Sequence, residues 1–514
     1  MRLHPFAVLA LSVIAAHIVR AGAIAYDFPA DLPVSGIYQA TVDGKPVPVL
    51  ETRVGHVLSF GMDGPVKIEV TLKKAPGKVV VRPLSAGLRA DLAGANFGFT
   101  LDAPRNLSVE MDGDLDHPLF VFANGPEKDR PAKNAPKVRY FEAGKIHEAG
   151  EIVLHDGETM YMEGGAVVHG TIRALDGSNI SIRGPGILDC RPRKKKTNTL
   201  VVRNCSRVTL SDFLLIDSHG WSIHLSGSDG VRMSNVRVLG WRANCDGTDI
   251  EYSKNVSIDG CFWRNSDDCI AVKALFPPRV KGISLEHMTD PEVLNGTKAP
   301  RIAGDEIGNI SVTRSVFWND FPGNAFEIGF ELRADKLKGV TLKDCDIIHV
   351  RRGAAISIHN ADRAAIEDVL IENVRVEDTD ELLDFYVGLS IYSDDCPAPY
   401  RRNNPKRAGI PKENLDPAAH DNKGQWFVPS QMDHDKFSAN RGSISNVRIR
   451  GLHCLTEPRS GSIFSGYDSK HGISKVTISD LVISGRPVKS AADAKLKLKD
   501  VQGLSFDGSA SAGR

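Results

Sequence analysis

Two patterns of hydrophobic and polar residues divide the chain. Over residues 26–127, apolar and polar residues alternate in short runs bounded by Gly, Pro and Asp, as in 66–70 and 78–83. Alternation with a period of two is typical of strands that bury one face. We therefore predict a small antiparallel β-sandwich over 26–127. The polar, proline-rich stretch 125–136 is the candidate linker that follows it.

Beyond the linker a short phrase recurs: Asn-Val-x-Ile-x, then Asp or Asn, a small residue or Cys, and two apolar residues. Repeats of this length indicate a solenoid. Successive repeats lie 28, 23, 25, 54, 30, 29, 78 and 29 residues apart, so the two large gaps hold insertions or weaker coils. The anchor positions of the repeats are Ile180, Val208, Val231, Val256, Ile310, Val340, Val369, Val447 and Val476.

The repeats favour a right-handed parallel β-helix, an all-β solenoid, over residues 137–505. Each repeat has too few apolar residues for a core of its own, so stacking must supply the core. The lack of a helical period argues against an α-solenoid, and the repeats are too short for the four-stranded blades of a propeller. The larger insertion, about 392–442, is rich in Pro, Asn, Arg and Asp. Long loops of this kind carry function or are disordered.

The N-terminus resembles a secretory signal. A short basic start precedes an apolar run over 6–19, and small residues lead up to Ala25. We predict a signal peptide over 1–25 with cleavage near Ala25. His17 and Arg20 depart from the pattern, and an uncleaved anchor is the alternative, although the run is short for a membrane span. The mature protein is then expected to be secreted or periplasmic and free of the membrane.

Composition narrows the classes of partner. The 64 Lys and Arg residues balance the 64 Asp and Glu residues. This balance removes any bulk electrostatic case for nucleic acid, an anionic membrane surface or a strongly acidic polymer. Eight cysteines permit disulfides in an oxidising compartment, but their spacing matches no zinc motif, and buried free thiols are the favoured alternative.

Three aspartates stand in the most informative passage, residues 241–273. Asp246 and Asp267 lie 21 residues apart, and Asp268 follows directly. Residues one coil apart become lateral neighbours in a stacked solenoid, separated by about 4.8 Å plus the divergence of their side chains. We therefore expect the three carboxyl groups to form one patch.

Clustered carboxyl groups suit glycoside hydrolysis. Repulsion holds some of them protonated, which is the state that a general acid needs near neutral pH. One carboxylic acid protonates the leaving oxygen while another carboxylate activates water, and a gap of about 6.5–9.5 Å leaves room for that water and inverts the anomeric centre. A calcium site and the capping of turns are the two alternative uses of such residues. Asn-x-Asp-Gly followed one coil later by Asp-Asp-Cys favours catalysis.

These runs carry a family resemblance. N-C-D-G at 244–247 and D-D-C-I-A-V-K at 267–273 resemble the two aspartate motifs of glycoside hydrolase family 28, the polygalacturonases and their relatives, which share the pectin-lyase-like β-helix. The resemblance implies that Asp267 is the general acid, and that Asp246 and Asp268 position and deprotonate the attacking water. It implies no cofactor.

The chain departs from polygalacturonases in two motifs. Those enzymes carry a Gly-His-Gly on a following coil and an Arg-Ile-Lys further on, which grips the substrate carboxylate. Here Asn324 replaces the His, and the phrase at 353–359 lacks both cations. A buried anion without a partner is costly, so a uronate substrate would require a cation from Arg333, Arg351, Arg352 or the long loop.

Residues 328–351 are also similar to the corresponding stretch of glycoside hydrolase family 49, the dextranase and isopullulanase group. That family shares the β-helix and the three-aspartate inverting site, and it carries an N-terminal β-sandwich. The sugar and its linkage therefore stay open, between uronate and neutral. A second Asp-Asp-Cys, at 394–396, follows no Asn-x-Asp phrase one coil earlier, and we assign it no catalytic role.

Several residues around the aspartates are candidates for substrate binding. Trp221 falls one coil before Asp246, where an aromatic face packs on a sugar, and ordinary solenoid surface is the alternative. Lys273 follows the second motif and is expected to contact substrate or to pair with Asp246. The candidate binding residues are Asn244, Lys273, Asn324, Glu327, Trp221 and His224. We predict no metal site, because His349 and His359 lack converging ligands and are expected to be structural.

The sequence therefore predicts an inverting glycosidase that hydrolyses α-linked O-glycosyl bonds in a polysaccharide or oligosaccharide, with no cofactor and no nucleic-acid partner. Two alternatives remain. One is a calcium-dependent polysaccharide lyase, and the other is a carbohydrate-binding solenoid without catalysis.

Overall fold

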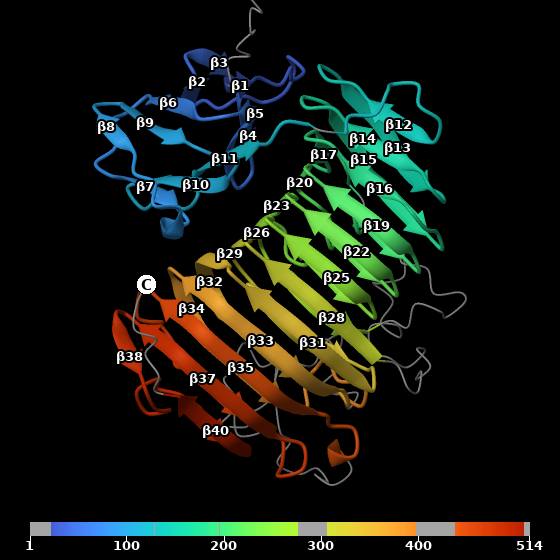
Figure 1. Ribbon diagram of the computed structural model, residues 1–514, viewed down its shortest axis with the longest axis vertical. Coiled ribbons are helices and arrows are strands. Elements are labelled where there is room, and N and C mark those ends of the chain that lie inside the picture. The colour runs from blue at the N-terminus through green and yellow to red at the C-terminus, as the bar shows by residue number, and fades with distance from the viewer. Residues whose placement is uncertain (1–21, 128, 195, 276–305, 397–436, 508–514) are drawn as a thin grey trace, which may run out of the picture.

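The computed structural model describes residues 22–127, 129–194, 196–275, 306–396 and 437–507. Strands dominate these segments and form two parts, an N-terminal β-sandwich and a long parallel β-helix (Figure 1). The predicted fold class is confirmed. No helix in the described segments is long and apolar enough to cross a membrane.

The sandwich consists of two sheets with one 3-10 turn, η1 (Leu84–Ala86). The six-stranded sheet has the order β1 (Gly22–Ile24), β5 (Gly55–Asp63), β11 (Leu119–Asn124), β10 (Asn106–Met111) and β7 (Val79–Arg82), with β4 (Val49–Thr52) also paired to β5. The five-stranded sheet has the order β3 (Lys45–Val47), β2 (Tyr38–Val42), β6 (Val66–Leu72), β9 (Asn96–Leu101) and β8 (Asp91–Ala93).

One strand pair differs from the antiparallel expectation. β5 and β11 run parallel, because the chain between them crosses to the five-stranded sheet and returns. Both strands are also buried along nearly their whole length, since the β-helix covers the face that the five-stranded sheet leaves free.

Coils of the β-helix contribute to three ladders of parallel strands. The anchor ladder contains β12 (Val138–Phe141), β14 (Thr159–Met162), β16 (Ser181–Arg183), β19 (Ser206–Ser211), β22 (Asp229–Ser234), β25 (Lys254–Asp259), β28 (Glu306–Thr313), β31 (Lys336–Lys343), β33 (Ala365–Val376), β35 (Ser443–Cys454), β37 (Ile473–Ile483) and β40 (Val501–Asp507). The docking ladder contains β13 (Ile146–Leu154), β15 (Val167–Leu175), β17 (Ile187–Asp189), β20 (Leu214–Ile216), β23 (Arg237–Leu239), β26 (Phe262–Asn265), β29 (Val316–Asn319) and the start of β32 (Asp346–Asn360).

The site ladder starts at the end of β15 and includes the end of β32. Its other strands are β18 (Leu200–Arg203), β21 (Ile223–Ser226), β24 (Thr248–Glu251), β27 (Ile270–Ala274), β30 (Phe326–Leu332), β34 (Thr379–Val387), β36 (Ile463–Ser465) and β39 (Lys497–Lys499). A short strand, β38 (Arg486–Val488), turns back antiparallel on β37.

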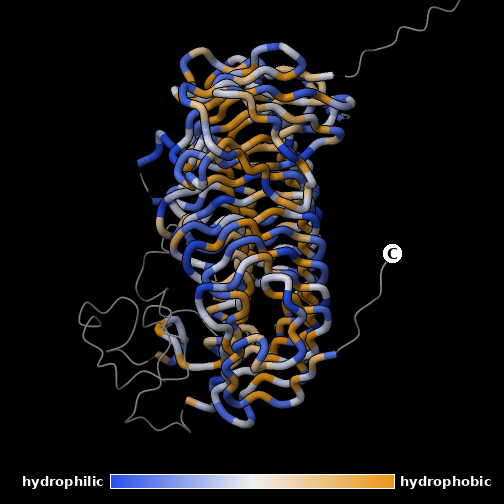
Figure 2. The backbone as a smooth tube through the Cα atoms, turned by 90° about the vertical axis from the view of Figure 1, so that its left-hand side faces the viewer, coloured by the Kyte–Doolittle hydropathy of each residue, from blue (hydrophilic) through white to orange (hydrophobic). Residues whose placement is uncertain are grey.

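The anchor positions of the sequence repeat pair one with the next along the anchor ladder. Val256 pairs directly with Ile310, and Val369 with Val447. The two large sequence gaps are therefore insertions within a coil, and most of their residues, 276–305 and 397–436, lie outside the described residues. Buried apolar side chains fill the inside of the stack, and Figure 2 shows hydrophobic residues along its length. All eight cysteines are buried and none of them forms a disulfide, as the favoured interpretation expected.

Aromatic side chains join the sandwich to the docking ladder. Phe120 on β11 lies with its ring centroid 5.6 Å from Phe262 and 6.0 Å from Trp318, and Phe122 lies 5.4 Å from Phe262. All four rings are buried. The sandwich is therefore packed on the stack as closely as a protein core, along the edge shown in Figure 1.

Buried polar contacts fix the orientation of this interface. Arg237 on β23 donates to the Oδ1 atoms of Asn106 and Asn124 at 2.7 and 2.6 Å. Nε2 of His349 lies 2.9 Å from Oε1 of Glu110, which fits the structural role expected for this histidine. Each pair satisfies a polar group that would otherwise be buried alone.

The linker and β1 also form specific contacts. Arg130 of the linker forms an ion pair with Glu163, and Tyr161 donates to Glu127, so the linker lies against the first coils. β1 pairs with β5 just before the predicted cleavage position at Ala25. The rest of the predicted signal peptide lies outside the described residues, and its cleavage stays a prediction.

We expect Phe120→Ala to lower the free energy of unfolding by about 3–5 kcal/mol, because the ring is buried between both parts and its removal leaves a cavity. Leu92→Ala is the control, since Leu92 is 39% exposed on β8, and it should change stability by about 0.5 kcal/mol or less. Urea denaturation measures both. A loss of stability in Phe120→Ala as small as that in Leu92→Ala would contradict a packed interface.

Candidate active site

Turns that lead into the site ladder place the candidate residues in one column. Gly247 N–H donates to the carbonyl of Asp268 at 2.8 Å, and Cys269 N–H donates to that of Asn324 at 3.0 Å. The lateral partner of Asp246 is therefore Asp268, one register step from the 21-residue spacing noted in the sequence. Asp246, Asp268 and Asn324 stand at equivalent positions, each two residues before its strand.

Asp267 departs from this column through its backbone. Its φ is 77°, in the left-handed region that few residues other than glycine adopt. Its N–H donates to Pro322 O and its carbonyl accepts from Asn319 Nδ2, both at 2.6 Å. Gly323 packs on the same peptide, where an added Cβ would lie 2.4 Å from the carbonyl carbon of Asp267. The turn thus directs Asp267 beside the column.

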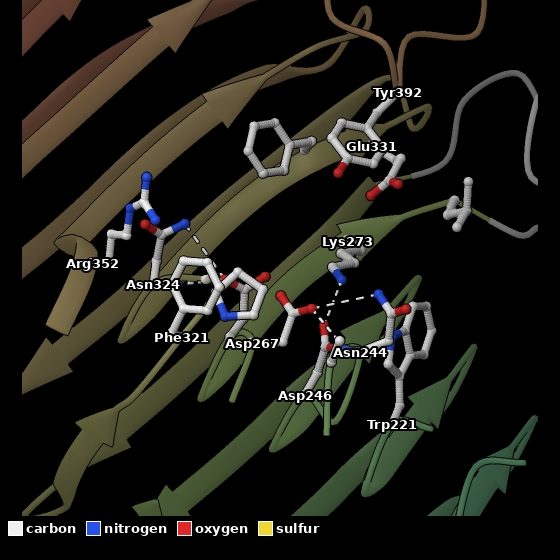
Figure 3. A pocket seen from close by; sticks show the side chains of 16 residues that line it. Trp221, Asn244, Asp246, Asp267, Lys273, Phe321, Asn324, Glu331, Arg352 and Tyr392 are labelled. Atoms are coloured by element: carbon white, nitrogen blue, oxygen red, sulfur yellow. Dashed lines mark hydrogen bonds and ion pairs between the residues drawn. The ribbon is translucent and has the colours of Figure 1, made fainter. Parts of the chain in front are cut away.

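The three carboxyl groups converge as predicted. One oxygen of each aspartate lies within 4.8 Å of one oxygen of the others. Asp246 and Asp268 are buried, and Asp267 is half-buried. They lie in a cavity of about 360 Å³ (Figure 3). Its lining is completed by Trp221, Ala243, Asn244, Lys273, Leu275, Phe321, Pro322, Gly323, Asn324, Phe330, Glu331, Arg352 and Tyr392.

Asp268 is held by Asn324, whose N–H donates to Oδ1 at 2.8 Å. Burial raises the pKa of Asp268 well above its usual value, and the neighbouring charges of Asp267 and Glu327 raise it further. A carboxylate with a raised pKa is a stronger base once it is ionised. Asp267 in turn accepts the N–H of Asn244 at 3.0 Å.

A row of buried charges lies behind Asn324. Its side-chain amide donates to Oε2 of Glu327 at 2.9 Å. Nδ1 of His359 lies 3.1 Å from Oε1 of Glu327, and its Nε2 lies 3.0 Å from Oδ2 of Asp384. Burial alone lowers the pKa of His359, but the two carboxylates outweigh it and raise that pKa well above its usual value. A protonated His359 therefore keeps Glu327 in place.

Lys273 neutralises the other side of the cluster. Its Nζ lies 3.0 Å from Oδ2 of Asp246 and 3.0 Å from Oδ1 of Asp249. Burial alone lowers the pKa of Lys273, but Asp246 and Asp249 outweigh it and raise that pKa. The ammonium also lies 4.6 Å from the centre of the Trp221 ring. Lys273 thus pairs with Asp246, which was one of its two expected roles.

Two of the six candidate binding residues do not line the cavity. Glu327 is fully buried behind Asn324. His224 is fully buried beneath Trp221, and its Nε2 lies 2.7 Å from Oε2 of Glu251. Neighbouring side chains cover both of them and neither lines the cavity, so the expectation of direct substrate contact is corrected to one of support. Asn244, Lys273, Asn324 and Trp221 do line the cavity.

Sequence reasoning missed Asp249, Glu331, Phe330 and Tyr392. Asp249 and Glu331 carry a usable signal, because each is an acidic residue inside a strand of mostly buried residues. Tyr392 carries none, since it follows β34 in an irregular segment. Among the three arginines considered as uronate partners, Arg352 lines the cavity.

The other two arginines serve elsewhere. Arg351 forms an ion pair with Asp320 at 2.9 Å, and Arg333 is buried and donates to Leu275 O at 3.2 Å. The second Asp-Asp also has structural contacts, because Asp395 pairs with Arg441.

The same three aspartates offer the oxygen ligands that a divalent cation prefers. Lys273 already supplies positive charge at Asp246, at 3.0 Å, so a cation would compete with the ammonium. The arrangement favours proton transfer over metal binding.

Comparisons with known proteins show what the chain is similar to. The family model "Glycosyl hydrolases family 28" matches residues 160–289, which include all three aspartates. The chain resembles that family. A probable polygalacturonase of Arabidopsis thaliana is 32% identical over 95 residues, which are 18% of this chain and 21% of that relative. The match thus spans about a fifth of the relative's length.

One solved structure resembles nearly the whole chain in fold. Dex49A from Penicillium minioluteum aligns with a TM-score of 0.62 and 13% identity over 94% of this chain and 100% of its own. The shared fold includes the sandwich as well as the stack. A polygalacturonase from Erwinia carotovora ssp. carotovora covers 73% of this chain and 91% of its own, with a TM-score of 0.46 and 15% identity.

Lys273→Met should lower the free energy of unfolding at neutral pH by about 3–5 kcal/mol, because it leaves two buried carboxylates without their cation. Burial raises the pKa of Asp249, and the charge of Asp246 raises it further. The loss of stability in the variant should therefore shrink as the pH falls through the raised pKa of Asp249, because protonation of Asp249 removes its repulsion with Asp246. Lys254→Met, at an exposed lysine, is the control. Denaturation at several pH values measures the effect, and a pH-independent loss would contradict it.

Proposed function

We propose that the protein is an inverting glycoside hydrolase that cleaves α-glycosidic bonds in a polysaccharide or oligosaccharide. The observation that carries the proposal is the convergence of three carboxyl groups in one cavity, two of them buried and one half-buried. The match to the family 28 model over these residues supports it. Under this proposal the predicted export would place the enzyme where such polymers are met.

Asp267 is assigned the role of general acid. It is the most exposed of the three carboxyl groups and stands beside the column that the other two form. In the reaction its proton passes to the glycosidic oxygen as the bond from that oxygen to the anomeric carbon breaks. The leaving sugar departs with that proton, and Asp267 becomes a carboxylate.

Asp246 and Asp268 are assigned the role of positioning and deprotonating the attacking water. Two oxygens that both hydrogen-bond one water at about 2.8 Å are about 4.5 Å apart, which is close to the limit of 4.8 Å found here. The water gives a proton to one of these carboxylates while its oxygen bonds to the anomeric carbon. Asn324 and Lys273 hold the two carboxylates in place.

The nearest oxygens of the three groups lie closer together than the gap of about 6.5–9.5 Å that is typical between acid and base in inverting enzymes. Retaining enzymes use a gap of about 5–5.5 Å and a covalent intermediate. The anomeric configuration of the product when it first forms, followed by NMR, distinguishes the inverting from the retaining mechanism. Inversion is the expected result, and net retention would contradict the proposed role of water.

Asp267→Asn is expected to lower kcat by about a hundred- to ten-thousand-fold, because an amide has no proton to give the leaving oxygen. The release of reducing ends from a panel of neutral and acidic glycans measures this loss. Asp229→Asn, at an exposed aspartate on β22, is the control and should keep full activity.

Near wild-type turnover by the Asp267 variant would exclude the assigned acid. An unsaturated product that absorbs in the near ultraviolet and disappears with a chelator would indicate a lyase instead. Glycan binding without new reducing ends would indicate a binding protein.

Glu327→Gln should move the acidic limb of the pH profile of kcat/KM to lower pH. Glu327 is one of the charges that raise the pKa of Asp268, so its neutralisation lowers that pKa and leaves Asp268 ionised in more acidic solution. Glu372→Gln, on the outer face of β33 and paired with Lys343, should leave the limb in place. An unchanged limb in the Glu327 variant would contradict the role of Asp268 as base.

A further inference from the structure

Glu331 is a cavity carboxyl group that the hydrolytic roles leave unused. It lies at the end of β30, is 8% exposed, and faces the same cavity as the three aspartates. Figure 3 shows its carboxylate on the side of Lys273 and Tyr392. In the described part of the chain Glu331 has no hydrogen-bond partner, so its oxygens are available to a ligand.

The charge of Glu331 is only partly offset, since it is one of the nearby carboxylates whose charges raise the pKa of Lys273, after those of Asp246 and Asp249. Lys273 is the nearby cation, and it already contacts Asp246 and Asp249 at 3.0 Å each. The other cation of the lining is Arg352, which lies 5.1 Å from the centre of the Phe321 ring and at the opposite end of the cavity in Figure 3. The half of the cavity beside Glu331 therefore carries net negative charge.

Aromatic rings border the same half. Phe330 and Tyr392 lie with their ring centroids 5.0 Å apart and their planes tilted by 32°, and Trp221 stands below Lys273. Rings of this kind pack against the apolar faces of pyranoses, while a carboxylate accepts hydrogen bonds from their hydroxyl groups. The chemistry suits a sugar that offers hydroxyl groups and no carboxylate.

On the basis of the proposed hydrolase function, we infer that the sugar bound beside Glu331 is neutral and that Glu331 selects against uronates. A uronate carboxylate there would face Glu331 and the aspartates. Lys273 is already paired with Asp246, and Arg352, the other cation of the lining, lies at the opposite end of the cavity (Figure 3). Two like charges in a partly buried cavity repel strongly enough to weaken binding by about tenfold. A neutral pyranose avoids this repulsion and keeps the hydrogen bonds.

Binding to the Asp267→Asn variant tests this inference without turnover. Calorimetry compares neutral α-linked oligosaccharides with oligogalacturonates of the same length. We expect a neutral sugar to bind more tightly. Adding Glu331→Gln should raise the affinity for oligogalacturonates by about tenfold and change that for the neutral sugar by less than about twofold, because the amide keeps an acceptor oxygen.

Glu148→Gln is the matched control, since Glu148 is an exposed carboxylate on β13, far from the cavity, and it should change neither affinity. Oligogalacturonates that bind as tightly as neutral sugars, no binding of either set, or no gain in the Glu331 variant would overturn the inference. Reducing ends released by the wild-type enzyme report on hydrolysis separately. Cleavage with a uronate preference would overturn this inference alone, and a neutral preference without cleavage would overturn the hydrolase function alone.

Discussion

Backbone hydrogen bonds between successive coils are the constraint on which the candidate site depends. They hold Asp246, Asp268 and Asn324 in one column, so residues 22 and 56 positions apart along the chain become direct neighbours. A register slip of one residue would turn these side chains toward the opposite face of the sheet. The apolar stack inside the coils prevents such a slip, because each anchor residue must stay buried against the next.

The stack brings like charges together, and the surrounding residues make this tolerable. Lys273 lies between Asp246 and Asp249, and a protonated His359 lies between Glu327 and Asp384. Each buried cation thus serves two carboxylates. Asp268 forms no ion pair among the described residues, and Asn324 donates a hydrogen bond to it. Burial raises its pKa, and the charges of Asp267 and Glu327 raise it further, which makes Asp268 a stronger base once it is ionised.

The repeat phrase predicted the stack because alternation and spacing report directly on burial and register. Eight of the nine anchors, from Val208 to Val476, pair as expected across both insertions. Ile180 lies directly before β16, where Ser181 pairs with Thr209. Side-chain direction was harder to predict. Glu327 lies three residues after Asn324 and His224 three residues after Trp221, yet both are fully buried outside the lining of the cavity. Tyr392 reaches the cavity from an irregular segment. Such directions depend on packing between coils, which spacing along one chain does not encode.

Hydrolysis in water enriched in oxygen-18 tests the central claim most directly. If Asp246 and Asp268 activate a water for attack on the anomeric carbon, each cleavage should place one solvent oxygen at the new reducing end. Mass spectrometry of the products would then show a gain of one labelled oxygen per bond broken. In the Asp267→Asn variant, turnover and this gain of label should both be lost. Products without solvent oxygen at the anomeric carbon would contradict the account.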